Sequence, residues 1–234
     1  MKTRYSIPIL AAILLAFAVM VWPVATPVTQ TTPVNLRDTV HIVTIVAPDG
    51  TVVGNGSGVM VAPRLMLTAA HVSGIGDRTL RVGIEQAPAK VIKVDVLADI
   101  ALLQVALGCP CAPVAWVNPQ VDAEAIAIGH PSFNHAATQI LTTGRIQGYV
   151  PSDRRLMFSA PISGGNSGGG LFVDGELVGI VVELISAGDG MFTITHIFHL
   201  ARAVDTKTMI DFYFSYKPPR VDPKLNDYAG GRLG

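Results

Sequence analysis

The chain has 234 residues and a formal net charge of zero; half of its residues are hydrophobic and 15% are charged. This length suits one large β domain or two small ones, with a substantial core that needs no cofactor. The neutral charge, without blocks of basic residues interleaved with aromatic ones, argues against a nucleic acid as the main partner.

The first 25 residues form a separate segment. Lys2 and Arg4 precede an apolar run from Ile7 to Ala25, which is the pattern of an export signal. The run is longer than the usual signal core and approaches the roughly 20 residues that span a bilayer. We therefore expect residues 1–25 to form a hydrophobic anchor helix, with a signal peptide cut after Ala25 as the alternative. The rest of the chain would be membrane-anchored on the exported (periplasmic or extracellular) side, or secreted after cleavage.

The next segments predict short strands. Residues 26–38 are rich in Thr and Pro and indicate an extended linker. From Thr39 onward, β-branched and apolar segments alternate with Gly and Pro turns, which predicts strands. The first set of predicted strands is 40–47, 58–61, 65–68, 80–84, 91–97 and 100–105. The second set is 125–128, 138–142, 145–150, 156–159, 170–173, 177–183 and 191–196.

Strands at this spacing predict an all-β fold. Two sets of about six strands, with the change-over near residues 108–118, predict two small barrels. Residues 200–214 have a helical rhythm of apolar side chains and predict a C-terminal helix. Residues 217–234 are polar, with prolines and glycines, and predict a disordered tail. The predicted folded domain is therefore 39–216.

The loop Pro161–Leu171 reads P-I-S-G-G-N-S-G-G-G-L. Glycines allow close approach and unusual backbone angles, so such a loop can aim two N–H groups at a developing anion. Ser167 within it is a candidate nucleophile, which requires a base and an orienting carboxylate elsewhere. Gly- and Ser-rich stretches are more often flexible linkers, so the loop alone does not decide the function.

Two further segments supply the missing groups. His71 ends L-T-A-A-H, directly after a predicted apolar strand, and Asp99 stands immediately before the predicted strand 100–105. Each is weak evidence alone, because a lone histidine is usually structural and an aspartate before a strand is usually a turn residue. Asp95 is a rival carboxylate, but it lies inside a strand pattern.

Together, in the order His71, Asp99, Ser167, these contexts resemble the trypsin-like serine peptidases, over roughly residues 40–216. The HtrA/DegP-type branch is the most similar. The segments that carry this likeness are G-S-G (56–58), A-I-A-I-G-H-P (125–131), G-N-S-G-G (165–169) and G-E-L-V-G-I (175–180). The resemblance implies two six-stranded antiparallel β-barrels with the active site in the cleft between them. The sequence departs from that branch, because it leaves no room for a PDZ module after the predicted catalytic domain.

The resemblance also implies catalytic roles. Ser167 would attack the scissile carbonyl, His71 would act as general base and then general acid, and Asp99 would orient the imidazole. The N–H groups of Gly165 and Ser167 would form the oxyanion hole. Asn166 cannot form the ion pair with a newly cut N-terminus that activates many digestive members, so we expect no zymogen cleavage.

By the same resemblance, Pro161 and Ile162 would line the base of the specificity pocket, with Leu184 near its rim. Val182 and Glu183 fall where the family's substrate pairs alongside the enzyme; Glu183 is alternatively a solvated edge residue. None of the pocket residues carries a negative charge, so a bound Arg or Lys would be buried unpaired. We therefore expect cleavage after small or medium apolar residues.

The remaining polar motifs favour structural roles. Cys109 and Cys111 are separated by one residue, which leaves a tight disulfide or two free thiols open and makes a poor zinc site. His130 and His135 fit a surface turn better than a metal site. Packing roles are expected for three further histidines: His41, His196 and His199. No metal ligands and no cofactor are predicted.

The leading hypothesis is thus a membrane-anchored serine endopeptidase acting on exposed or unfolded protein segments. Its partners would be protein or peptide substrates and, through the N-terminal helix, a membrane; its oligomeric state is left open. Two alternatives remain: a peptidase-like module that binds peptides or a partner without cutting, and an esterase that uses the same triad.

Overall fold

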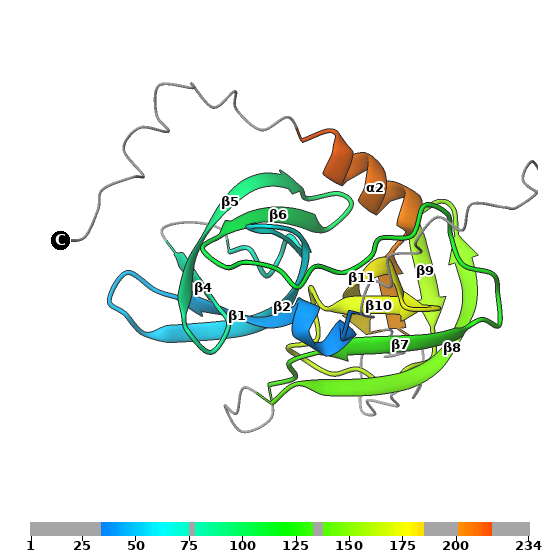
Figure 1. Ribbon diagram of the computed structural model, residues 1–234, viewed down its shortest axis with the longest axis horizontal. Coiled ribbons are helices and arrows are strands. Elements are labelled where there is room, and N and C mark those ends of the chain that lie inside the picture. Colours follow the sequence, from blue (N-terminus) through cyan, green and yellow to red (C-terminus); the bar gives the residue numbers. More distant parts are fainter. Residues whose placement is uncertain (1–33, 75–77, 133–137, 185–200, 217–234) are drawn as a thin grey trace, which may run out of the picture. The chain divides into compact units, whose positions relative to one another are not determined.

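The computed structural model describes residues 34–74, 78–132, 138–184 and 201–216. Over these ranges the chain forms a short 3-10 helix, η1 (Leu36–Thr39), twelve strands and one α-helix, α2 (Thr206–Phe214). The strands fall into two closed six-stranded barrels, the first coloured blue to teal and the second green to orange (Figure 1).

The first barrel has the strand order β1-β2-β3-β6-β5-β4, with every neighbouring pair antiparallel. Its strands are β1 (Val40–Val46), β2 (Val52–Ala62), β3 (Leu65–Thr68), β4 (Thr79–Val82), β5 (Ala87–Asp95) and β6 (Ile100–Val105). Closure leaves no strand edge unpaired, which is how small antiparallel barrels avoid exposed edges.

The second barrel has the order β10-β11-β12-β9-β8-β7 and is antiparallel throughout. Its strands are β7 (Glu124–Gly129), β8 (Ile140–Val150), β9 (Arg155–Phe158), β10 (Gly170–Val173), β11 (Glu176–Leu184) and β12 (Ala201–Val204). The predicted pair of six-stranded antiparallel barrels, with the change-over between β6 and β7, is confirmed.

The two barrels share apolar packing. The core of the first barrel includes Val59, Leu67 and Leu102, and it continues into Phe172 and Ile180 of the second barrel. A separate cluster, which includes Ile146, Phe158 and Leu171, fills the second barrel. Because protein interiors are close-packed, this continuous contact fixes the loops at the junction of the barrels.

One predicted break in the second barrel is wrong. Residues 138–142 and 145–150 were expected to be two strands, but β8 runs unbroken through Gly144, which pairs with Ala125 of β7. A Cβ at Gly144 would collide with the main chain of Ala160. Gly144 is therefore needed for a close contact between two backbones inside a strand. In the sequence, such a glycine looks the same as a glycine in a turn.

The predicted helix 200–214 also begins too early. Residues 201–204 form β12, which pairs with both β11 and β9 and closes the barrel. The helix begins only after Asp205, whose carboxylate accepts the N–H of Thr208 as an N-cap. The barrel ladder thus overrides the helical rhythm upstream of the cap, whereas Met209 and Phe212 do face the core as expected.

Helix α2 docks against the first barrel as well as the second. Lys93 of β5 donates to the carbonyl of Phe212 at 2.7 Å, and its ammonium lies 4.2 Å from the centre of the Phe212 ring. A cation at the C-terminal end of a helix satisfies otherwise unpaired carbonyls.

The predicted strand 191–196, the linker up to residue 33, the N-terminal apolar helix and the tail 217–234 lie outside the described residues. In the part of the chain that the structure describes, no helix has the length and apolar character needed to cross a membrane.

Candidate active site

Asp99 is placed by the tight turn that joins β5 to β6. The carboxylate of Asp95 accepts the N–H of Ala98 at 2.9 Å, and the N–H of Asp99 reaches the carbonyl of Val96. Asp99 itself has a φ of 52°, in the left-handed region that aspartate tolerates better than most residues. The rival carboxylate Asp95 is therefore occupied within the turn, and Asp99 projects from it.

His71 is brought to the same end of the first barrel by strand pairing. Thr68, the last residue of β3, pairs with Ala101 of β6, so the segments just after Thr68 and just before Ala101 are neighbours. The small residue Ala69 accepts the N–H groups of Val72 and Ser73, which forms a short helical turn around His71.

Asp99 holds His71 at two points. One carboxylate oxygen, Oδ2, lies 2.8 Å from Nδ1 of the imidazole, and the other, Oδ1, accepts the main-chain N–H of His71 at 3.0 Å. The hydrogen bond to Asp99 raises the pKa of His71 above its ordinary value, while burial acts in the opposite direction. The His71 side chain stays half exposed, so its far edge is open to a bound molecule.

Ser167 lies in the loop before β10. The N–H of Gly168 donates to Val181 at 2.7 Å, and the N–H of Val181 donates back to Gly169 at 2.9 Å, which ties the loop to β11. Gly168 has a φ of 87°, and a Cβ there would collide with the carbonyl of Ser57 and the hydroxyl of Thr68. Only glycine fits this position, because both the backbone angle and the space exclude a side chain.

The Ser167 loop and the His71 turn meet at β2. The carbonyl of Ser167 accepts the N–H of Ser57 at 2.8 Å. A Cβ at the neighbouring Gly56 would lie 2.5 Å from the side chain of Val72 and 3.0 Å from the carbonyl oxygen of Ser167. Val72, the residue after His71 in the first barrel, and Ser167 of the second barrel therefore both pack against Gly56.

The loop before Ser167 is braced by the first barrel and by the segment after β7. The hydroxyl of Ser57 donates to the carbonyl of Gly165 at 2.8 Å, and the N–H of Ser132 donates to the carbonyl of Gly164 at 2.8 Å. Because the Gly164 carbonyl is turned to Ser132, the N–H of Gly165 on the same peptide plane points the opposite way. Within residues 138–184 and the other described ranges, neither this N–H nor that of Ser167 donates to a protein acceptor.

Asn55 completes this bracing network. Its amide donates to the carbonyl of His130 at 3.2 Å and its Oδ1 accepts the Ser132 hydroxyl at 2.6 Å. The N–H of His130 in turn donates to the hydroxyl of Ser57 at 2.8 Å. The sequence alone predicts no role for Asn55, Ser57 or Ser132, because nothing local to the G-S-G segment shows what its serine contacts.

Ser167 is half-buried, and its hydroxyl makes no hydrogen bond to His71 or to any other residue that the structure describes. Catalytic hydrogen bonds are often long before substrate is bound, so this geometry is compatible with a nucleophile.

The residues expected at the specificity pocket are only partly described. Pro161 is exposed and its carbonyl accepts the hydroxyl of Thr142 at 2.7 Å. Ile162 is half-buried against the core of the second barrel, and Val182 is buried in β11. Glu183 and Leu184 belong to β11, but their side chains lie outside the described set.

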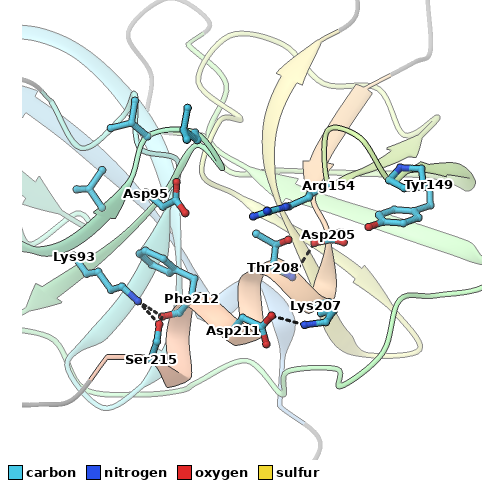
Figure 2. Close-up of a pocket in the computed structure, with 14 residues that line it drawn as sticks. Lys93, Asp95, Tyr149, Arg154, Asp205, Lys207, Thr208, Asp211, Phe212 and Ser215 are labelled. Atoms are coloured by element: carbon cyan, nitrogen blue, oxygen red, sulfur yellow. Dashed lines mark hydrogen bonds and ion pairs between the residues drawn. The ribbon is translucent and has the colours of Figure 1, made fainter.

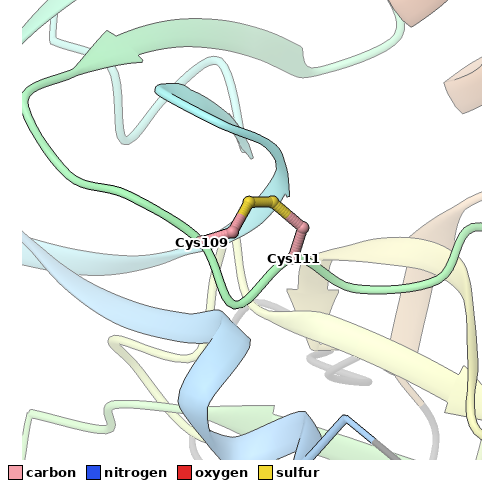
Figure 3. The surroundings of a disulfide bond; sticks show 2 residues. All are labelled: Cys109 and Cys111. Atoms are coloured by element: carbon pink, nitrogen blue, oxygen red, sulfur yellow. A yellow bond between two sulfur atoms is a disulfide. The ribbon is translucent and has the colours of Figure 1, made fainter. Parts of the chain in front are cut away.

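The segment between the barrels contains a disulfide. Cys109 and Cys111 are joined across Pro110, with their Cα atoms 4.7 Å apart (Figure 3). Among the described residues, no group of three or more His, Cys, Asp or Glu side chains is arranged to hold a metal ion.

Two histidines outside the His71–Asp99 pair are wholly or partly buried. His41 of β1 is half-buried with its Nε2 inaccessible, as expected of a packing residue, and His130 is 7% exposed. The expectation that His130 stands in a surface turn is wrong, because this residue contributes to the contact between the two barrels. His135, His196 and His199 lie outside the described residues.

We expect His130 to make the fold sensitive to acid. Burial, with a smaller effect of nearby His41, lowers the pKa of His130 from its ordinary 6.5 to about 4. Between these pH values the unfolded chain binds a proton that the folded chain does not, so the free energy of unfolding should fall as pH drops from about 6.5 to about 4, by up to about 3 kcal/mol. Urea unfolding of the wild type and of His130→Gln at pH 7.5 and 4.5 measures this.

The variant should lose the part of the acid-dependent difference in the free energy of unfolding that His130 causes, because glutamine does not titrate. It should keep the part due to His41, whose pKa is also lowered by burial. An equal drop in both proteins would show that other groups cause the acid sensitivity.

Comparisons with known proteins give both a family and structures of similar fold. A family model for the trypsin-like peptidase domain matches residues 56–180, which is more than half of the chain. A serine endoprotease from Yersinia pestis superposes with a TM-score of 0.64 and 23% identity, covering 79% of this chain and 67% of that one. The inactive form of the Rv3671c protease superposes with a TM-score of 0.60 and 20% identity, covering 77% and 89%.

A search of curated protein sequences gives no significant match. At the identities above, the solved structures establish the likeness of fold, and the family model establishes the relationship in sequence. The chain therefore belongs to the trypsin-like peptidase family and, by that relationship in sequence, is a serine endopeptidase.

Proposed function

We propose that the chain cleaves peptide bonds within exposed or unfolded protein segments, with Ser167 as nucleophile, His71 as general base and Asp99 as the group that orients it. The observation that supports this most strongly is the double contact of Asp99 with the ring and the main chain of His71. The N–H groups of Gly165 and Ser167, which donate to no described residue, are a second support, since an oxyanion hole needs such donors.

The proposed reaction has two stages. The Ser167 oxygen attacks the scissile carbonyl carbon while Nε2 of His71 takes its proton, and the resulting oxyanion accepts the N–H groups of Gly165 and Ser167. His71 then gives the proton to the leaving amine, which departs and leaves an acyl-enzyme. Water attacks this ester with His71 again as base, and the intermediate collapses to release the carboxylic acid and restore Ser167.

Reaction with a fluorophosphonate tests the proposal directly. The activated Ser167 oxygen should displace fluoride and form one covalent phosphonyl adduct, identified by mass spectrometry of the full chain after digestion. Because His71 activates the nucleophile, His71→Ala should slow labelling at least about 100-fold. A folded wild-type protein that stays unlabelled would favour the alternative, a module that binds peptides without cutting them. The observation that favours this alternative is the lack of a hydrogen bond between Ser167 and His71.

We also propose a preference for small or medium apolar residues just before the cleaved bond. The apolar character of Pro161 and Ile162 supports this, because a cationic side chain bound there would lose its hydration without gaining a partner. Profiling with a peptide library should give at least about tenfold higher kcat/KM for Val or Ala than for Arg or Lys at that position. A preference for Arg or Lys would contradict the assignment.

The apolar run Ile7–Ala25 supports the further proposal that residues 1–25 anchor the enzyme in a membrane, with the catalytic domain on the exported side. Retention of the full chain in membranes washed at high pH would be expected. Release of a shortened soluble form would instead indicate cleavage after Ala25.

A further inference from the structure

A cavity of about 460 Å³ lies where the turn that carries Asp99 faces the second barrel. The first barrel contributes Asp95, Leu97 and Ala98 to its lining, and the second contributes Arg154 and Arg155 at the start of β9, with Arg202 of β12. Ala98 directly precedes Asp99, so one wall of this cavity is the same turn that orients His71.

Arg155 is the unusual member of this lining. It is only 9% exposed, and its Nη1 is buried without a hydrogen-bond partner. None of the described residues forms a side-chain hydrogen bond or ion pair with its guanidinium. Burying a charge without a partner is costly, and an apolar side chain of similar volume would fill the position at less cost. Among the described residues, the fold therefore supplies no partner that explains an arginine at residue 155.

Other charges around the cavity do not compensate Arg155. Arg202 lies diagonally from it on the same face of the sheet, because Arg155 pairs with Val204 and Arg202 pairs with Met157. The carboxylate of Asp153 lies 3.5 Å from Arg202, and that of Asp95 accepts the N–H of Ala98. Both acidic groups of the lining are thus engaged elsewhere.

Arg154 adds a second positive charge to the lining of this cavity. It has a φ of 55°, which turns the chain sharply before β9, and its side chain is exposed. It also lines an adjoining cavity of about 760 Å³, and Figure 2 shows its guanidinium pointing across that cavity toward the side of Asp95. The basic residues further along this cavity have partners, since Lys207 pairs with Asp211 and Lys93 binds the end of α2.

We propose that this cavity is a subsite for an acidic side chain, Asp or Glu, of the bound polypeptide, with Arg155 and Arg154 as the groups that recognise its carboxylate. The inference rests on the proposed function, because it places a substrate side chain beside the His71–Asp99 pair. Guanidinium groups bind carboxylates through two parallel hydrogen bonds, which are among the strongest available in proteins. Leu97, which is 97% exposed at the cavity wall, offers apolar contact to the stem of such a side chain.

The test uses the full chain and pairs of fluorogenic peptides that are identical except for one residue, Glu in one and Gln in the other. The Glu/Gln position is moved in turn from the second to the fifth residue before the cleaved bond. At one of these positions kcat/KM should be about tenfold higher for Glu than for Gln, and the ratio should shrink in high salt. A ratio near one at all four positions, with cleavage observed, overturns the proposal.

Variants then identify the group responsible. Arg155→Met should bring the Glu/Gln ratio close to one, and Arg155→Lys should keep part of it, because the charge remains while the paired hydrogen bonds do not. Arg81→Met, which removes an exposed arginine from β4, is the matched control and should keep the full ratio. A full ratio in a folded Arg155→Met overturns the assignment to Arg155. If that variant does not fold, the Arg155→Lys and wild-type ratios decide.

Failure of the proposed function gives a different result. If no peptide is cleaved, binding of the same peptides to Ser167→Ala is measured by fluorescence anisotropy. Tighter binding of one Glu peptide than of its Gln partner would support the acidic subsite while removing the catalytic proposal. Equal binding, or no binding, would overturn the subsite.

Discussion

Replacement of Ser167 by Ala is expected to lower kcat/KM for any cleaved peptide by about 10⁵-fold or more. The substitution removes the only atom that can form the acyl-enzyme in the proposed reaction, and triad residues act as a unit, so losing the nucleophile alone removes most of the acceleration. Removing the hydroxyl should leave the fold intact, because the Ser167 side chain makes no hydrogen bond to any described residue. Initial rates with a fluorogenic peptide and circular dichroism of both proteins measure the effect.

Ser163→Ala is the matched control, because it removes a hydroxyl from the same loop at a position with no proposed role in the reaction. Its activity should remain close to that of the wild type. Retained peptide cleavage in a folded Ser167→Ala would remove the proposed nucleophile and, with it, the acyl-enzyme pathway.

Asp99→Asn is expected to reduce kcat by about 10⁴-fold while leaving the fold intact. Asp99 accepts hydrogen bonds from both Nδ1 and the main-chain N–H of His71. An amide that keeps the main-chain contact presents its NH₂ group to the ring, which favours the wrong imidazole tautomer and does not stabilise the cation formed during catalysis.

The same substitution should also move the pH profile. Catalysis needs neutral His71, so activity rises as this residue loses its proton, with a midpoint above its ordinary pKa because Asp99 raises it. Without the carboxylate the pKa of His71 falls, and the residual activity of Asp99→Asn should reach half its maximum at lower pH. Asp122→Asn, which alters an exposed ion pair with Arg145, is the control and should change neither rate nor profile. An unshifted profile would mean that Asp99 does not set the proton affinity of the base.

The proposed oxyanion hole depends on contacts between the barrels more than on the Gly-rich loop itself. The hydroxyl of Ser57 receives the N–H of His130 and donates to the carbonyl of Gly165, so one side chain of the first barrel fixes two segments of the second. Ser132 sets the orientation of the Gly164–Gly165 peptide. Glycines make the required backbone angles accessible, and these partners select among them.

Much of the site could be predicted from local sequence. The alternation of apolar residues with turns predicted the strands, because strand side chains alternate with a period of two and Gly and Pro interrupt them. Placement of His71 directly after β3 and of Asp99 directly before β6 then followed, since each is only a few residues from its strand. Local context also favours Asp99 over Asp95. The turn explains this, because the Ala98 N–H donates to the Asp95 carboxylate and holds it within the turn.

Other features depended on the whole fold. The strand role of residues 201–204 comes from a ladder with β9 and β11 that competes with a helical sequence pattern. The contact of Ser57 with Gly165 joins residues 108 positions apart, and that of Asn55 with His130 spans 75. The lack of a partner for Arg155 among the described residues likewise depends on which segments surround it. Local sequence determines which elements form and which side chains stand at their ends. Hydrogen-bond partners and buried charges are decided only when closure of the two barrels brings distant segments together, because burial and hydrogen-bond geometry are properties of that packing.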